Sequence, residues 1–302
     1  MIDILINAGN FVAIIILGYV LRRIGVFKKE DFQVLSKITI RITLSASIIV
    51  SFSTMKLDYS MLTLPLLGLS AGLIYIGLAF LLNLHSPKEK KAFEILNFSG
   101  YNIGCFTMPF AQSFLGSVGV VTTNLFDAGN AFISLGGSFG IAQMVKRGSA
   151  FSFKKLMKAL LKSPPFVCYI LMTIINISGF SLPAPVVSCA NTVAKANAFM
   201  AMFMIGVGFE LSSQPGCLKT LIKILIVRYS VASILAIIFY FLLPFSLEVR
   251  QALVILAFSP IGSAVPGFTN EIEGDVGLSS AINSMTILCS VVINIVLFAV
   301  IL

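Results

Sequence analysis

Apolar residues along this chain of 302 residues fall into long runs separated by short polar segments. A helix rises about 1.5 Å per residue, so about 20 apolar residues are needed to cross a hydrocarbon core about 30 Å thick. On that scale the sequence predicts an all-α membrane protein with ten transmembrane helices. Their approximate ranges are 2–21, 32–52, 61–82, 92–115, 118–144, 165–177, 186–211, 221–243, 251–269 and 278–302, and the sixth is short.

The fourth run is interrupted where a membrane helix should be smooth. Gly100, Asn102, Gly104 and Pro109 lie near its centre. Proline removes a helical hydrogen bond, and each backbone group freed in hydrocarbon costs several kcal/mol unless protein, water or a ligand satisfies it. A helix broken at this place must therefore line a buried cavity.

The ninth run repeats this pattern in the second half of the chain. Residues 95–100 (ILNFSG) are echoed by 255–260 (ILAFSP), and Pro109 is echoed by Pro266. Two interrupted spans at matching places in two halves are typical of secondary transporters, whose binding site lies between them near the bilayer midplane.

Composition agrees with a polytopic membrane protein. Apolar residues make up 58% of the chain and charged residues only 11%, whereas soluble proteins have roughly 25% charged residues. The net charge is +9, but the basic residues fall mostly between apolar runs, so we expect no nucleic-acid partner. The five cysteines are scattered without CxxC spacing, which indicates neither a disulfide framework nor a metal site.

Basic residues in the connections predict the orientation. They gather after spans one, three, five and seven, whereas the other side carries only Lys56 and Arg250. The odd-numbered connections are therefore expected to be cytoplasmic and both termini to lie outside. One odd connection is an exception, because it holds Glu271, Glu273 and Asp275 and no basic residue. The basic residues are Arg22, Arg23, Lys28, Lys29, Lys88, Lys90, Lys91, Lys146, Arg147, Lys154, Lys155, Lys158, Lys162 and Lys219.

Five spans in each half mean that the second half enters the membrane from the opposite side, so we expect two inverted repeats. The first repeat is 1–145 and the second is 164–302. The basic segment 146–163 between them is predicted to be a cytoplasmic linker with a short amphipathic helix at the anionic inner leaflet, with a regulatory role as the alternative.

Span five carries an acid near its centre. Asn124, Asp127, Asn130, Ser134 and Ser138 are spaced three or four apart and so share one helical face. A charge at this depth is a functional candidate by default. Asp127, with Asn130 beside it, can carry a coupling proton, hold a sodium ion or neutralise a neighbouring cation.

Each half also carries a cation within its second span. If Gly25 is aligned with Gly179, Arg41 falls on Lys195. A cation from each repeat facing a common centre would suit a carboxylate. In the competing interpretation Lys195 pairs with Asp127, and Arg41 extends to the interface.

The broken spans add further candidate ligands. Helices that begin at a midplane break present unpaired N–H groups, which favour anions. Asn102 is the natural side-chain donor at the first break, and Ser259 and Ser263 take this place at the second. In the last span Asn283 could face the same centre, although polar residues also join spans without touching ligand.

Catalysis is not expected. Residues 136–140 match GxSxG, but a nucleophile elbow needs a preceding strand and a histidine partner, and the single histidine, His85, lies in a loop. The sequence has no P-loop and no dinucleotide motif, so no cofactor and no ATP-driven pumping are predicted.

The first break resembles the auxin efflux carrier family. Residues 102–109 (NIGCFTMP), followed by Phe114-Leu115-Gly116, look like the first crossover of its bacterial members. Segments 199–206 and 260–266 resemble the seventh span and second crossover. The chain departs from the family pattern at Thr107, where glycine is common, and near Ser45, where proline is frequent.

The resemblance implies a fold similar to sodium/proton antiporters, with spans 1, 2, 6 and 7 as scaffold and spans 3–5 and 8–10 as transport unit. It also implies transport of auxins in plants or of small carboxylates such as malate and malonate in bacteria. The chain lacks the long central hydrophilic loop of many plant carriers, which favours the bacterial branch and the cell inner membrane. Related folds often dimerise through scaffold spans, which implies a homodimer.

Together these features predict a permease for small organic anions, driven by a proton or sodium gradient through alternating access. Asp127 and Asn130 would couple the ion. The alternative is a monovalent cation/proton antiporter that uses Asp127. The expected substrate-binding residues are Asn102, Pro109, Lys195, Arg41, Ser259, Pro260, Ser263, Pro266 and Asn283.

Overall fold

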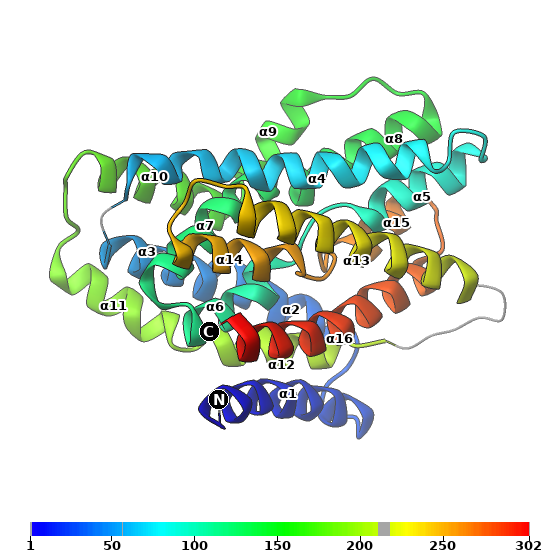
Figure 1. Cartoon of the computed structure of the whole chain (residues 1–302). Helices are drawn as coiled ribbons and strands as arrows, with labels where there is room; N and C mark the ends of the chain where they lie inside the picture. The colour runs from blue at the N-terminus through cyan, green and yellow to red at the C-terminus, as the bar shows by residue number, and fades with distance from the viewer. Residues whose placement is uncertain (1, 56, 211–217, 302) are drawn as a thin grey trace.

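The computed structural model describes residues 2–55, 57–210 and 218–301, with only the backbone of residues 2–5. Within these ranges the chain forms sixteen α-helices, three π-helical segments, one 3₁₀ segment and no strand. Most helices run roughly parallel to one another in a single bundle (Figure 1). The predicted all-helical class is therefore confirmed.

The first half of the chain contains twelve of these segments. They are α1 (Ile2–Arg23), α2 (Asp31–Ile38), η1 (Thr39–Leu44), α3 (Ser45–Ser53), η2 (Tyr59–Thr63), α4 (Leu64–Leu81), α5 (Lys88–Phe98), η3 (Ile103–Thr107), α6 (Met108–Phe114), α7 (Gly116–Phe132), η4 (Ile133–Gly137) and α8 (Ser138–Arg147).

The second half contains eight. They are α9 (Phe153–Leu161), α10 (Pro164–Ile177), α11 (Ala184–Ala194), α12 (Asn197–Gly208), α13 (Leu218–Phe241), α14 (Leu247–Ala257), α15 (Val265–Glu271) and α16 (Val276–Ile301).

Helix length and composition support a multi-pass membrane protein. Five helical stretches are long and apolar enough to cross a membrane, or six if α9 and α10, which are bent by 78°, form one span. Several other predicted spans are divided. Span 92–115 becomes α5, η3 and α6, and span 251–269 becomes α14 and α15. The sequence predicts a continuous span over 186–211, but Lys195 and Ala196 separate α11 from α12.

Two helix pairs approach closely at glycines. A Cβ at Gly206 of α12 would lie 2.0 Å from the carbonyl oxygen of Ile15 in α1, and one at Gly129 of α7 would lie 1.7 Å from that of Pro65 in α4. Without side chains at these points the backbones pack directly, as membrane helices commonly do. In each pair, α1 with α12 and α4 with α7, the two helices lie side by side along much of their length. Helices α1 and α4 lie on opposite sides of the bundle (Figure 1).

The linker forms the amphipathic helix that the sequence predicts. In α9, Leu156 and Leu160 are buried, whereas Lys154, Lys155 and Lys158 are exposed on the other side. The buried leucines pack in a small cluster with Ala131 and Phe166, and this cluster joins the linker to α7 and α10. Contact with an anionic leaflet stays a prediction.

The exceptional acidic connection lies beside the basic linker. Glu273 is 3.7 Å from Lys146 and 3.5 Å from Arg147. Lys146 also donates to the carbonyl of Ile272, and Arg147 donates to that of Glu271 at 3.2 Å. The acidic connection and the start of the linker therefore occupy the same end of the bundle.

Some expectations lie outside the described residues. They concern Lys56, Cys217, Leu211 at the end of span seven, and Leu302 at the end of the last span.

Candidate functional site

The first interruption is a four-residue gap between α5 and η3. Ser99 is extended, and Gly100 has φ +76°, a left-handed conformation that glycine adopts without a steric penalty. Helical structure resumes at Ile103. Pro109 is the second residue of α6, which continues directly from η3, and it lacks the N–H that would bond back along this helical stretch.

The second interruption lies between α14, which ends at Ala257, and α15, which begins at Val265. Pro266 again occupies the first turn of the new helix. The two gaps meet, because the backbone N–H of Asn102 donates to the carbonyl of Pro260 at 2.8 Å. The hydroxyls of Thr107 and Ser259 also share a hydrogen bond. The structure therefore has both predicted breaks and brings them together.

An asparagine from a neighbouring helix supports each gap. Asn130 of α7 accepts from the N–H of Tyr101 and donates to its carbonyl, both at 3.0 Å. Asn283 of α16 donates to the carbonyls of Ile261 at 3.2 Å and Gly262 at 3.3 Å. Both side chains satisfy backbone groups that a continuous helix would have paired internally.

A cavity of about 110 Å³ lies beside the meeting point. It borders the start of η3 and the segment before α15, and η1, α7, η4 and α10 form its other walls. Asp127 is the only carboxylic acid among its described lining residues, which include no lysine, arginine or histidine. Six of the lining residues are Asn102, Gly104, Asp127, Ser134, Tyr169 and Ser263.

Two donors hold the carboxylate of Asp127. One oxygen accepts from the Asn130 amide at 2.9 Å, and the other accepts from the Tyr169 hydroxyl at 2.8 Å. A Cβ on Gly104 would lie 3.6 Å from the second oxygen, so the carboxylate lies against the start of η3. A negative charge here balances the positive end of the helical stretch 103–114.

The side-chain amide nitrogen of Asn102 has no hydrogen-bond partner among the described residues, although Asn102 is only 5% exposed. A buried donor without a partner costs about 1–3 kcal/mol. Since Asn102 lines the cavity, this amide is available to an acceptor inside it.

Arg228 of α13 holds the other side of the meeting point. It is 1% exposed and donates to the carbonyls of Phe98 at 2.6 Å, Gly100 at 3.0 Å and Ser259 at 2.8 Å. These carbonyls lie at or just beyond the C-terminal ends of α5 and α14, where a cation is favourable. The Tyr75 and Tyr101 rings lie 5.0 and 5.1 Å from the guanidinium carbon. Arg228 therefore forms hydrogen bonds with the backbone of both interrupted segments.

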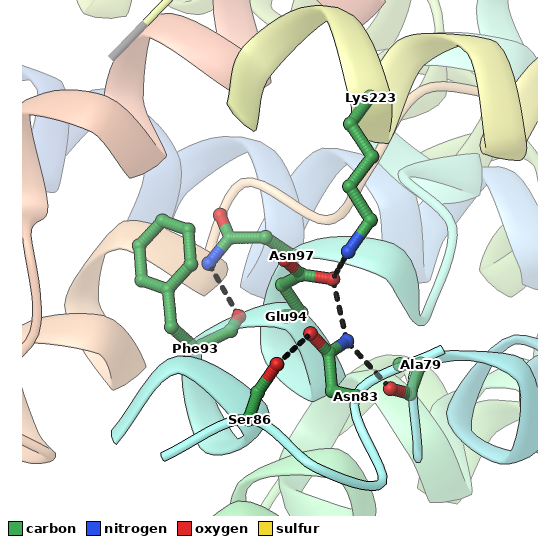
Figure 2. Close-up of polar contacts among 7 residues, drawn as sticks. All are labelled: Ala79, Asn83, Ser86, Phe93, Glu94, Asn97 and Lys223. Carbon is green, nitrogen blue, oxygen red and sulfur yellow. Dashed lines mark hydrogen bonds and ion pairs between the residues drawn. The ribbon is translucent and has the colours of Figure 1, made fainter. Parts of the chain in front are cut away.

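A second buried charge cluster lies around Glu94 in the middle of α5 (Figure 2). The carboxylate of Glu94 is fully buried and accepts from Lys223 and from Asn83, both at 2.6 Å. Asn97, one turn farther along α5, accepts from Ser279 at 2.7 Å. This cluster joins α5 to the end of α4, to α13 and to α16.

Arg228, Glu94 and Lys223 are absent from the residues that the sequence singled out. All three are ionisable residues within or at the edge of predicted spans, so the criterion that selected Asp127 would have found them.

The two predicted cations lie elsewhere. Lys195 lines a separate cleft, and Arg41 is exposed and borders neither that cleft nor the Asp127 cavity. Among residues 2–55, 57–210 and 218–301, no ion pair joins Lys195 to Asp127. The predicted common cationic centre is therefore not assembled in this conformation. The GxSxG serine, Ser138, is buried and donates to the carbonyl of Ile133 at 3.1 Å.

Comparison with known proteins adds one relative. The chain is 28% identical over 215 residues to an uncharacterized transporter of Methanocaldococcus jannaschii, and the match covers 68% of each chain. It is similar to a protein named as a transporter. No protein-family model matches the chain, so the resemblance to auxin efflux carriers remains a prediction.

Proposed function

We propose that this protein is a secondary transporter that moves small organic anions such as carboxylates across the cell inner membrane by alternating access. One observation carries the proposal. Two interrupted helices meet beside a cavity that is lined by the carboxylate side chain of Asp127. The named transporter relative supports the general class.

Two matching features of the halves support ten spans in two inverted repeats, 1–145 and 164–302. The interrupted helices match in length, since α5 and α14 have 11 residues each and α6 and α15 have 7 each. Asn130 and Asn283 support their gaps in similar ways. We assign spans 1, 2, 6 and 7 to a scaffold and the remaining spans to the moving unit.

Contacts between connections support the proposed orientation, with both termini outside. Lys29 pairs with Glu210 at 2.7 Å, and Arg22 donates to the carbonyl of Phe209 at 2.7 Å. Arg22 and Lys29 follow predicted span one, and Phe209 and Glu210 lie at the end of span seven, directly after α12; both of these ends are assigned to the cytoplasm. An ion pair between Lys146 and Glu273 likewise joins the connections after spans five and nine, which are also odd-numbered.

Hydrogen bonding in the cavity favours an anion over a metal cation as cargo. Each oxygen of Asp127 already accepts one hydrogen bond, which leaves the carboxylate only part of its acceptor capacity for a sodium ion. The free amide of Asn102 and the start of η3 supply positive potential. A volume of about 110 Å³ is below the roughly 300–1,000 Å³ of drug-sized ligand pockets, which limits the cargo to a small molecule.

Asp127 would couple this anion to a proton. Two negative charges about 4 Å apart repel by about 4 kcal/mol at an effective dielectric constant of about 20. A bound carboxylate therefore favours a proton on Asp127, and the proton favours the carboxylate to the same extent. Movement of both together would let a proton gradient drive anion accumulation.

The second candidate is a monovalent cation/proton antiporter. It is favoured by one observation, namely that Asp127 is the only carboxylic acid among the described cavity residues. In that mechanism sodium would displace the proton from Asp127, and no carboxylate would move.

Reconstituted protein distinguishes these functions. We expect an imposed pH gradient to drive uptake of labelled malonate or malate into proteoliposomes. Asp127→Asn should abolish gradient-driven accumulation but retain anion exchange, because the amide keeps the shape of the site. Glu94→Gln, which removes another buried carboxylate, should keep proton coupling.

A different result in the same assay would contradict the proposed anion transport. Collapse of a pH gradient by sodium, without uptake of any carboxylate in a panel of mono- and dicarboxylates, would replace the anion carrier with the antiporter. A thermal-shift screen of the purified protein against the same panel identifies the cargo, since a ligand stabilises in proportion to its occupancy.

A further inference from the structure

A second, larger cleft lies apart from the Asp127 cavity. Its volume is about 460 Å³, within the range of pockets that hold small-molecule ligands. Lys195 is the only charged side chain among its described lining residues. Six other lining residues carry a hydroxyl or an amide group, namely Ser47, Ser51, Thr54, Gln112, Ser117 and Asn191.

Lys195 is free to bind an anion in this cleft. No carboxylate forms an ion pair with it anywhere in the described ranges. Its side chain is exposed, and an ammonium group with three donors suits a carboxylate.

The stretch η1–α3 borders both the cavity and the cleft along one face. Ile40 and Leu44 border the cavity. Ser47 and Ser51, spaced three and four residues farther along, border the cleft. Gln112 of α6, which also lines the cleft, donates to the Ser47 hydroxyl.

Helix α7 provides a second shared face. Asp127 and Ala131 border the cavity, and Ser117 and Val120 border the cleft. Asn124 lies on the same face between these pairs, because the spacing is three or four residues throughout.

Asn124 lines neither the cavity nor the cleft, and it lies between them with both of its side-chain polar atoms unpaired within the part of the chain that the structure describes. It is fully buried, and neither its amide oxygen nor its amide nitrogen has a partner among the described residues. Buried polar groups are nearly always paired, so each exception needs an explanation. A polar ligand passing between cleft and cavity would supply the missing partner.

We propose that the cleft is a second anion-binding site, in which Lys195 binds the carboxylate of a small organic anion at the far end of the path that leads past Asn124 to Asp127. The role of this path rests on the proposed transport function, whereas anion binding at Lys195 can be tested independently of transport.

The test uses a cysteine next to Lys195. In a full-length variant whose five native cysteines are replaced by serine, Asn191→Cys places a thiol one helical turn from Lys195. Anionic and cationic methanethiosulfonate reagents then report the local charge. We expect Lys195→Gln to lower the ratio of anionic to cationic labelling rates by about tenfold, and millimolar malonate to slow labelling while Lys195 is present.

Val186→Cys is the matched control. Residue 186 is exposed near the start of α11, nine residues from Lys195 and on the opposite face of the helix, and it does not line the cleft, so its labelling should depend on neither Lys195 nor malonate. If Lys195→Gln leaves the labelling ratio of the thiol at position 191 unchanged, the proposal is overturned, as it is if neither malonate nor a panel of other small carboxylates protects that thiol. Protection at this site without carboxylate uptake in proteoliposomes would support the site and refute the proposed transport.

Discussion

The backbone N–H of Asn102 and the carbonyl oxygen of Pro260 form a hydrogen bond of 2.8 Å between the two interrupted segments. The bond joins two positions that lie in opposite halves of the chain. Since it uses only main-chain atoms, it leaves the side-chain amide of Asn102 available to the cavity.

Replacement of the Asn102 side chain should therefore separate binding from stability. We expect Asn102→Leu to raise the KM for carboxylate uptake by about tenfold or more, because a hydrogen bond to a charged group contributes about 1.5–3 kcal/mol. The thermal midpoint should change little, because the bond to Pro260 remains. Uptake kinetics in proteoliposomes measure the effect, and an unchanged KM would exclude a ligand role for this amide.

Arg228 should be essential to the arrangement of both gaps. Arg228→Met would leave the carbonyls of Phe98, Gly100 and Ser259 without their donor, at a cost on the order of 3 kcal/mol or more. We expect a large loss of thermal stability in detergent and loss of transport. Arg228→Lys should retain part of the stability, because it keeps the charge but loses the planar fork. Wild-type stability in the methionine variant would contradict this role.

Two glycines of α4 provide a matched pair for helix packing. A Cβ at Gly68 would lie 2.0 Å from the carbonyl oxygen of Phe126, whereas a Cβ at Gly77 would meet nothing within 4 Å. We expect Gly68→Ala to destabilise the protein by about 1–3 kcal/mol and Gly77→Ala to leave stability unchanged or slightly higher. Thermal unfolding of both variants measures the difference, and equal midpoints would mean that α4 and α7 can separate at little cost.

The Glu94 and Lys223 pair should behave as a coupled unit (Figure 2). Lys223→Met would leave the fully buried Glu94 carboxylate with Asn83 as its side-chain donor, which should cost about 3 kcal/mol. In the double variant with Glu94→Gln the loss should be smaller, because no charge remains unpaired. A thermal double-mutant cycle measures this coupling, and additive losses would show that the two residues act independently.

The interruptions at Gly100 and Pro260 could be predicted because glycine and proline act on their own backbone. The division at Lys195 could not, since neither it nor Ala196 disfavours a helix. Arg228 and Glu94 were identifiable as intramembrane charges, but the carbonyls that Arg228 binds belong to two distant segments, which no local pattern reveals.

The sequence alone determined the apolar helices, the positions of both broken segments and the polar face that carries Asp127, because all of these depend on helix length, backbone preference and residue spacing. Only the tertiary structure decided that the two gaps share a hydrogen bond, that Arg228 joins them and that Lys195 and Asp127 line separate cavities. The physical reason is that spacing defines a face of a helix, whereas close packing with neighbours decides what that face contacts.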